Sequence, residues 1–503
     1  MRRYLIPLLA TLCFAGEQNE KAHKLLDDAA ATVGSTTLEV HVLSLMHLGT
    51  LYRPYDKKKA IDFFRQAFAA TSASPEESKG ILQGEIVKNL ADISLPDAME
   101  QLRGMAEPAT TLEGKTSAID QVTQLLLAKS EFDEAMEVIG LVPASAAYPF
   151  HATGSVFDAL ANNDPRRVLI FTRATTAYQR KPEREFTEML HARWRKLPRE
   201  VAGSALQAVV NTILVKKDQN SNFAGDGADD SGKMRMKNLR TVELAQMYQV
   251  MKGLDPKQAE QLAASNQEIK TASLERLREK VAVENGDEPS EQDEAVLIPP
   301  PSLFRGADGR NLLDRMGKWE AAKRRAEAAA ELADDDLPQS LSQIEDLPFP
   351  TMKAELICEM ARQIAEEDVE TAKSLFKKCL DSAADIKDTS DTTGPLLAAA
   401  RAAMTLSQRD WAWEAMGKAI ISASESYVSE AHAEKVNKAL REYWPSLQMC
   451  RLTAYTAAKL FADEAEKLLG GVRDPDMSVI MRIEMARALM KEPLPVHNMS
   501  VQF

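Results

Sequence analysis

The feature that most constrains the fold is an alanine that returns in three similar helical stretches. The intervals between these alanines are 38 and 37 residues, which is the length of one helix-turn-helix unit. An aspartate lies near the start of each stretch, where a carboxylate is expected to cap free backbone N–H groups. The alanines are Ala60, Ala98 and Ala135, and the aspartates are Asp56, Asp97 and Asp133. The period predicts an array of helical hairpins, each burying its apolar face against its neighbours.

The clearest hairpin begins at residues 48–52 (LGTLY) and continues, after a short turn, through residues 56–67 (DKKKAIDFFRQA). Leu-Gly-x-x-Tyr followed by Ala-x-x-x-Phe-x-x-Ala resembles the tetratricopeptide and Sel1-like repeats. Gly49 and Ala60 are small where two antiparallel helices approach closely, and Phe64 is expected to fill the space around that contact. The resemblance covers about one repeat and implies a scaffold with a long concave surface for partners.

A second pair of internal copies lies in the last third of the chain. Residues 352–364 and 477–490 both contain Glu-Met-Ala-Arg, at positions 359–362 and 484–487. In the first copy an apolar side chain recurs at every fourth residue, which is typical of an amphipathic helix. We expect both segments to be core helices with no polar group facing inward.

Composition supports the same fold class. Ala, Leu, Glu, Lys, Arg and Met dominate, and all are strong helix formers. Long Val/Ile/Thr runs with a period of two are missing, which leaves little material for a sheet. The sequence therefore predicts an all-α fold, an α-solenoid of stacked antiparallel helical hairpins. The formal net charge of −13 argues against a general nucleic-acid binder, which needs a basic surface.

Glycine, proline and charge patterns divide the chain into segments. A Gly/Asp-rich stretch predicts a flexible loop, and an acidic stretch followed by three prolines predicts a linker. The expected segments are a leader at 1–15, tetratricopeptide-like repeats at 16–216, the loop at 217–238, a helical segment at 239–283, the linker at 284–310 and C-terminal repeats at 311–503.

The first 15 residues have the layout of a secretory signal peptide. Arg2 and Arg3 give a positive start, residues 4–14 are apolar, and Ala15 precedes an abrupt polar turn at Glu17. This leader predicts an exported protein, periplasmic or secreted. The alternative is a buried N-terminal helix in a cytoplasmic protein. No later stretch reaches the roughly 18 apolar residues of a membrane span.

Motifs of known chemistry are not found in the sequence. No His-Glu-x-x-His places two imidazoles on one helical face, and there is no phosphate-binding glycine loop or Gly-x-Ser-x-Gly elbow. Asp226, Asp229 and Asp230 lack the spacing and the later Glu of a calcium loop. We therefore predict no catalytic residue, no metal and no cofactor.

Two cysteines are candidates for a disulfide. If a turn lies near residues 367–368, Cys358 and Cys379 lie roughly level across a helical hairpin, at ~1.5 Å of rise per residue. An exported protein allows the bridge. Cys379 also lies on an apolar stripe, where a free cysteine is simply a small hydrophobic residue. Both interpretations stay open at this point.

One basic segment contrasts with the acidic remainder of the chain. Residues 166–199 carry ten basic and three acidic side chains, and they include Arg193, Trp194, Arg195 and Lys196. The segment is either a docking patch for an anionic partner or a solvated helix face whose long side chains cover apolar surface.

Three functions remain as hypotheses. The first is an exported, non-catalytic scaffold or envelope-associated module that binds a protein or peptide partner. The second is an enzyme on a helical toroid, acting on envelope polysaccharide through two inward carboxylates ~5–9.5 Å apart. The third is a structural component that oligomerises through the ends of its array.

Overall fold

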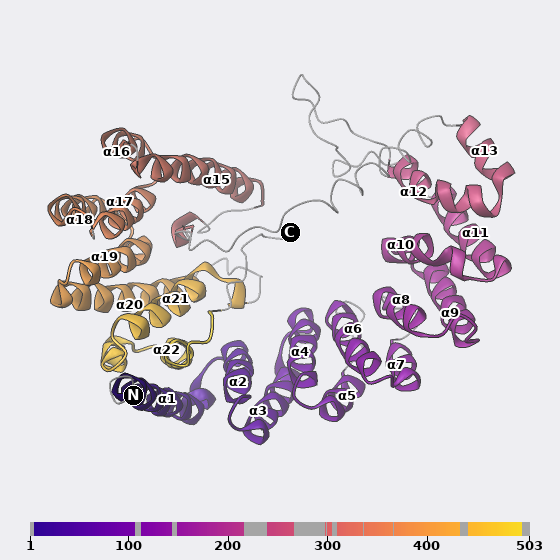
Figure 1. Cartoon of the computed structure of the whole chain (residues 1–503), viewed down its shortest axis with the longest axis horizontal. Coiled ribbons are helices and arrows are strands. Elements are labelled where there is room, and N and C mark those ends of the chain that lie inside the picture. The colour runs from indigo at the N-terminus through magenta and orange to yellow at the C-terminus, as the bar shows by residue number, and fades with distance from the viewer. Residues whose placement is uncertain are drawn as a thin grey trace. The chain divides into compact units, whose positions relative to one another are not determined.

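In the computed structural model, every regular secondary-structure element of the described residues is a helix (Figure 1). The structure describes residues 5–105, 112–142, 148–215, 239–265, 297, 299–303, 309–334, 336–365, 367–432 and 441–494. Over these ranges the expected all-α fold is confirmed, with α-helices and short 3-10 helices but no strand. The predicted loop at 217–238 lies outside the described residues, as do residues 266–283 and most of the predicted linker.

Contacts divide the chain into two compact units. Residues 1–73 and 292–503 form unit 1, and residues 74–291 form unit 2. Unit 1 is therefore discontinuous in sequence, because its first helices are separated from the rest by the whole of unit 2. The segment boundaries predicted from the sequence do not show that residues 1–73 and 292–503 belong together.

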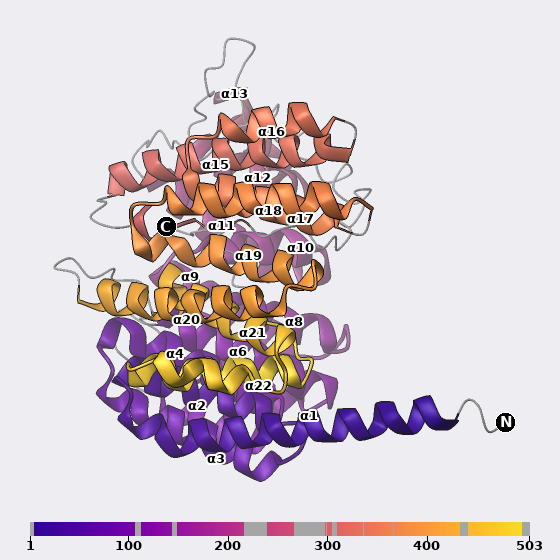
Figure 2. The ribbon, with the colours of Figure 1, turned by 90° about the vertical axis from the view of Figure 1, so that its left-hand side faces the viewer.

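In unit 1 most helices pack on their sequence neighbours, as in α17–α18, α19–α20 and α21–α22, and Figure 2 shows α17 to α20 lying side by side. The last helix, α22, packs against α1 and α2, so the N-terminal helices continue the row. The helices are α1 Leu5–Thr32, α2 Leu38–Tyr52, α3 Lys57–Ala70, α15 Gly309–Glu331, α16 Leu337–Glu345, α17 Pro350–Ile364, α18 Val369–Ala384, α19 Thr393–Thr405, α20 Arg409–Ala431, α21 Pro445–Leu460 and α22 Pro475–Leu489.

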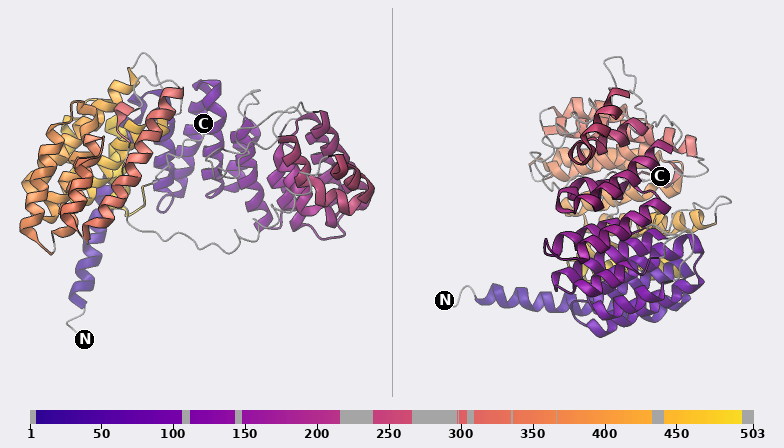
Figure 3. Two further views of the ribbon diagram at one scale, coloured as in Figure 1. Left: turned by 90° about the horizontal axis from the view of Figure 1, so that it is seen from above. Right: turned by 90° about the vertical axis from the view of Figure 1, so that its right-hand side faces the viewer.

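Unit 2 is a second row in which neighbouring helices pack on one another (Figure 3, right). Contacts run from α4–α6 through α6–α8 and α8–α9 to α9–α11 and α11–α12. The helices are α4 Glu76–Ala91, α5 Leu95–Gly104, α6 Leu112–Ala128, α7 Phe132–Ile139, α8 Phe150–Ala159, α9 Arg166–Arg180, α10 Arg184–Arg193, α11 Arg199–Val215, α12 Leu239–Leu254 and α13 Pro256–Ser265.

The hairpin with the clearest repeat pattern forms as its residues predict. Asp56 caps α3 by accepting a hydrogen bond from the Lys59 backbone N–H at 2.9 Å. A Cβ placed on Gly49 would lie 2.7 Å from the Phe64 ring, so only glycine permits this approach of α2 and α3. In α5 and α7 the N-cap residues are Ser94 and Glu131, whose side chains form no cap, and Asp97 and Asp133 lie in the first turns of these helices.

The C-terminal copies are core helices, with one correction. Met352, Leu356 and Met360 are buried in α17, as their spacing predicts. The expectation that no polar group faces inward is wrong for α22, where Glu484 and Arg487 are both buried. Their burial is explained by α1 and α2, which cover α22 from the opposite end of the sequence.

Candidate functional site

A concave surface lies in unit 2, where α8, α10 and α12 meet. Aromatic packing fixes α10 in this place. The Phe186 ring of α10 lies 5.4 Å from Phe150 of α8, 5.9 Å from Phe171 of α9 and 4.7 Å from Tyr178 of α9, measured between ring centroids. Tilted and offset pairs of this kind stabilise beyond the area that they bury. The side chains on the other face of α10, away from Phe186, remain available to line a groove.

The groove between these three helices has a volume of about 550 Å³. Its floor is apolar and is formed by Phe150, Met189, Ala245 and Met247, each at most 5% exposed. Methionine adapts its shape to different apolar partners. The polar lining residues are His151, Ser155, Glu185, Thr187, Glu188, His191, Arg193, Gln246 and Gln249. The groove can therefore hold apolar side chains below and hydrogen-bonding groups above.

Charge at the mouth of the groove is uneven. The Glu188 carboxylate accepts a hydrogen bond from Arg184 at 3.0 Å, and both side chains are exposed. Glu185, one turn earlier on α10, is also exposed and has no ion-pair partner among the described residues. At the other end of the helix, the Arg193 charge is compensated by Asp158. Glu185 is thus the uncompensated charge of the lining.

The basic segment predicted from sequence borders this groove. Arg193 and Lys196 both bind the Asp158 carboxylate, at 2.8 Å and 3.1 Å. The Arg195 guanidinium lies 4.8 Å from the centre of the Trp194 ring. That ring in turn covers Gly253 of α12, where an added Cβ would lie 2.1 Å from it. The segment therefore joins helices, while docking of an anionic partner to it stays a prediction.

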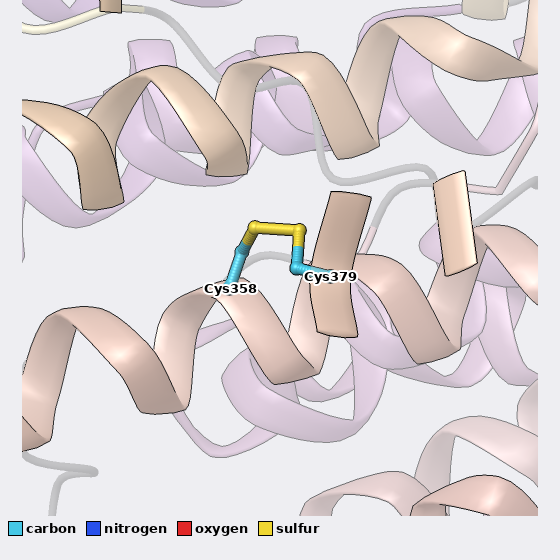
Figure 4. Close-up of a disulfide and its surroundings, with 2 residues drawn as sticks. All are labelled: Cys358 and Cys379. Atoms are coloured by element: carbon cyan, nitrogen blue, oxygen red, sulfur yellow. A yellow bond between two sulfur atoms is a disulfide. The ribbon is translucent and has the colours of Figure 1, made fainter. Parts of the chain in front are cut away.

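The structure brings the two candidate cysteines together. Cys358 of α17 and Cys379 of α18 form a disulfide with a Cα–Cα distance of 5.4 Å, and both are fully buried (Figure 4). α17 ends at Ile364 and α18 begins at Val369, so the two cysteines lie level across the hairpin. Cys450 is a free, buried thiol whose pKa is raised by burial.

A smaller pocket of about 50 Å³ in unit 1 is lined by Glu355, Glu359, Arg401 and neighbouring apolar side chains. Burial raises the pKa of Glu355 to about 8, although Arg401 opposes this. The volume is close to that of one or two water molecules, so it does not hold a substrate.

Metal ligands do not gather in the described part of the chain, where no three His, Cys, Asp or Glu side chains are placed to hold an ion. Within the same ranges, none of the helices is both long and apolar enough to cross a bilayer.

The groove was not predicted from the sequence. Its lining comes from helices that begin at residues 150, 184 and 239, and each contributes only part of one face. A hydrophobic pattern shows that a helix has a buried face, but not which neighbours leave a gap beside it.

Comparisons with known proteins add little to the geometry. No family of known proteins matches the sequence, and no curated protein is significantly similar to it. Among solved structures, the chain is similar to one described as a circular tandem repeat protein with novel repeat topology and enhanced subunit contact surfaces. That match has 12% identity, covers 96% of this chain and 97% of the other, and has a TM-score of 0.14.

Proposed function

We propose that this protein is an exported, non-catalytic α-solenoid of tetratricopeptide-like hairpins that binds a segment of a protein partner. The groove between α8, α10 and α12 carries this proposal. Its volume of about 550 Å³ lies in the range of ~300–1,000 Å³ that is usual for ligand-binding sites. Stacked helical hairpins commonly present such surfaces to peptides.

The lining of the groove selects the chemistry of the occupant. Apolar floor residues such as Met189 and Met247 favour one or two large apolar anchors. Glu185 lies at the mouth without an ion-pair partner in the described part of the chain, and it favours a cation beside those anchors. The proposed occupant is therefore a peptide segment that combines apolar residues with lysine or arginine.

Export is supported by two observations. The leader-like sequence at residues 1–15 includes the start of α1, and the described contacts of this helix, such as Lys21 with Asp463 at 2.7 Å, come after residue 15. Its removal leaves these contacts in place. The Cys358–Cys379 disulfide is typical of proteins that fold in oxidising compartments. N-terminal sequencing of the purified protein tests this step, and a mature chain that retains residues 1–15 would count against it.

The two alternative functions lack a specific supporting observation. A polysaccharide-acting enzyme needs a carboxyl group kept protonated by its surroundings. Burial raises the pKa of Glu355 to about 8, but its pocket of about 50 Å³ is too small for a sugar ring, and Glu185 and Glu188 of the groove are exposed to water. Sugar rings also need an aromatic platform, and Phe150 is buried in the floor. A structural oligomer would show a multiple of the monomer mass in light scattering. A monomer mass in dilute solution would exclude this function.

The experiment compares two fluorescent peptides with the same Leu and Phe anchors, flanked either by lysines or by glutamates. We expect the lysine peptide to bind more tightly. Ala192 is an exposed residue of the lining, so Ala192→Trp fills the groove without disturbing the core and weakens binding tenfold or more, a loss of about 1.4 kcal/mol. Glu185→Lys reverses the preference between the peptides.

Ala69→Trp is the matched control, because Ala69 is an exposed alanine on α3 that does not line the groove. It leaves both affinities unchanged. Equal binding by the Ala192→Trp variant and the wild type would place the peptide elsewhere. Failure of both peptides to bind the wild type would rule out this occupant for the groove.

A further inference from the structure

A buried cluster of charged side chains lies in unit 1, where α2, α21 and α22 meet. The Arg451 Nε donates to Glu484 Oε1 at 2.8 Å, and the Arg487 Nε donates to Glu484 Oε2 at 2.7 Å. His47 of α2 lies 3.3 Å from an Arg487 nitrogen. Glu484, Arg451 and Arg487 are 0%, 1% and 4% exposed. The cluster joins the N-terminal helices to the C-terminal ones.

Two guanidinium groups share one carboxylate in this cluster. Among the described residues, Glu484 is the one ion-pair partner of both Arg451 and Arg487. His47 is neutral near pH 7, because burial and the charge of Arg451 lower its pKa to about 4. Glu442, in the 3-10 helix Arg441–Tyr443, also acts on His47 electrostatically. Each arginine therefore has one oxygen of a shared carboxylate as its direct ionic partner, in a place where poorly compensated charge is destabilising.

Hydrogen-bond donors in the cluster are also left over. The Nη1 and Nη2 atoms of Arg451 are buried and have no partner among the described residues. The same holds for the Ser44 hydroxyl, which lies three residues before His47 on the same face of α2. A buried donor without an acceptor costs about 1–3 kcal/mol, and more for a charged group. The Arg451 guanidinium is thus a charged group with buried donors that no described residue uses.

The other copy of the Glu-Met-Ala-Arg motif, in α17, shows why donors beside α22 lack partners. Glu359 and Arg362 of α17 correspond to Glu484 and Arg487 of α22, and they also form an ion pair. In α17 the Arg362 side chain is 42% exposed, so water solvates its remaining donors. In α22 the corresponding pair is covered by α1 and α2.

We propose that the junction of α2, α21 and α22 binds a small monovalent anion of the size of chloride, held by the Arg451 guanidinium. Such an ion lies beside the buried guanidinium and accepts hydrogen bonds from Arg451 donors that no described residue uses. The site is independent of the peptide groove, which lies in the other unit. Because Arg451 of α21 shares Glu484 of α22 with Arg487, which contacts His47 of α2, the anion stabilises the packing of all three helices.

The first experiment measures unfolding of the full chain in sodium chloride, sodium bromide and sodium gluconate at the same ionic strength. Gluconate is too large to reach a guanidinium that is only 1% exposed. We expect the unfolding midpoint to rise with chloride or bromide concentration, by a few degrees relative to gluconate, because a ligand stabilises the state that binds it. Equal midpoints in chloride and gluconate would overturn the proposal and leave buried water as the partner of Arg451.

The second experiment assigns the effect to this cluster. Arg451→Met removes the guanidinium with its unpartnered donors, so the difference between chloride and gluconate disappears. Arg362→Met removes the corresponding arginine of the exposed motif and leaves the difference unchanged. Broadening of the ³⁵Cl NMR signal by wild-type protein, reversed by bromide, supports the site even if Arg451→Met does not fold. A chloride effect that persists in folded Arg451→Met would place the anion elsewhere.

Discussion

At the scale of single residues, burial and neighbouring charges act together on the acid–base groups of unit 1. Burial alone would raise the pKa of Glu484, but Arg451 and Arg487 beside it lower this pKa to about 2. Burial lowers the pKa of His47 to about 4, and the arginines reinforce this effect. Both groups therefore bind protons more weakly in the folded protein than in the unfolded chain.

These shifts predict a loss of stability in acid that begins near pH 6.5. Between about pH 6.5 and 4 the unfolded chain binds a proton at His47 that the native state refuses, so the free energy of unfolding falls as pH falls. Below about pH 4.5 Glu484 adds a second loss, which continues to about pH 2. Each group contributes at most about 1.4 kcal/mol per pH unit.

Urea denaturation at pH 8, 6 and 4.5 measures this dependence. His47→Gln removes the upper part of the loss, so the variant loses less stability than the wild type between pH 6.5 and 4.5. His432→Gln, at an exposed position on a helix end, keeps the wild-type slope. Identical slopes for His47→Gln and the wild type would show that His47 titrates normally.

At the scale of helices, glycines decide how closely two elements approach. Gly84 of α4 and Gly114 of α6 lie where these helices cross. A Cβ on Gly84 would be 2.3 Å from the Gly114 carbonyl oxygen, and a Cβ on Gly114 would be 2.0 Å from the Gly80 carbonyl oxygen. Backbone atoms cannot move aside as a flexible side chain can, so the crossing requires glycine.

Gly84→Ala is therefore expected to destabilise the protein by about 1–3 kcal/mol or more, because the two helices must separate. Gly203→Ala is the matched control. Gly203 lies in α11 with open space around its Cα, and alanine there should stabilise the helix by about 0.5–1 kcal/mol. Chemical denaturation of the two variants should give shifts of opposite sign. A neutral Gly84→Ala would mean that the crossing is looser than these distances require.

The contrast between the two glycine contacts shows how far the sequence could predict the structure. Gly49 and Phe64 are 15 residues apart in one hairpin with a known pattern, so their contact followed from spacing alone. Gly84 and Gly114 belong to different hairpins, and no periodic signal links them. The groove of unit 2 could not be predicted for the same reason, because α10 and α12 are in contact but are separated by a long stretch of sequence. Local sequence patterns determine where helices form. Which helices become neighbours when they are far apart in sequence depends on packing.

At the scale of the whole chain, the N-terminal helices pack on the last helices through specific polar contacts. The Thr37 backbone N–H and hydroxyl both donate to Asp476, at 2.7 Å each, across 439 residues of sequence. Asp476 also accepts from Tyr427 at 2.9 Å and pairs with Arg441 at 3.3 Å. Asp476 is 2% exposed, so these contacts are protected from water and salt.

This packing predicts that the chain stays together when its backbone is cut between the units. A protease site inserted between Glu291 and Gln292 separates α1–α13 from α15–α22 in sequence, while the contacts of α1 and α2 with α22 remain. The disulfide lies within the second fragment and cannot join the two. We expect the cut protein to elute from size exclusion as one species in native buffer.

Two further outcomes decide whether the polar contacts are responsible. Asp476→Ala leaves the Thr37 backbone N–H and the Arg441 charge without their buried acceptor, so the cut variant should separate at a lower urea concentration than the cut wild type. Asp463→Ala removes one exposed partner of Lys21 and should change little, since exposed ion pairs contribute about 0–1 kcal/mol. Immediate separation of the cut wild type in native buffer would show that the two ends of the chain do not form one unit. Co-elution with equal urea sensitivity in both variants would assign the association to the apolar contacts of α1 with α22 instead.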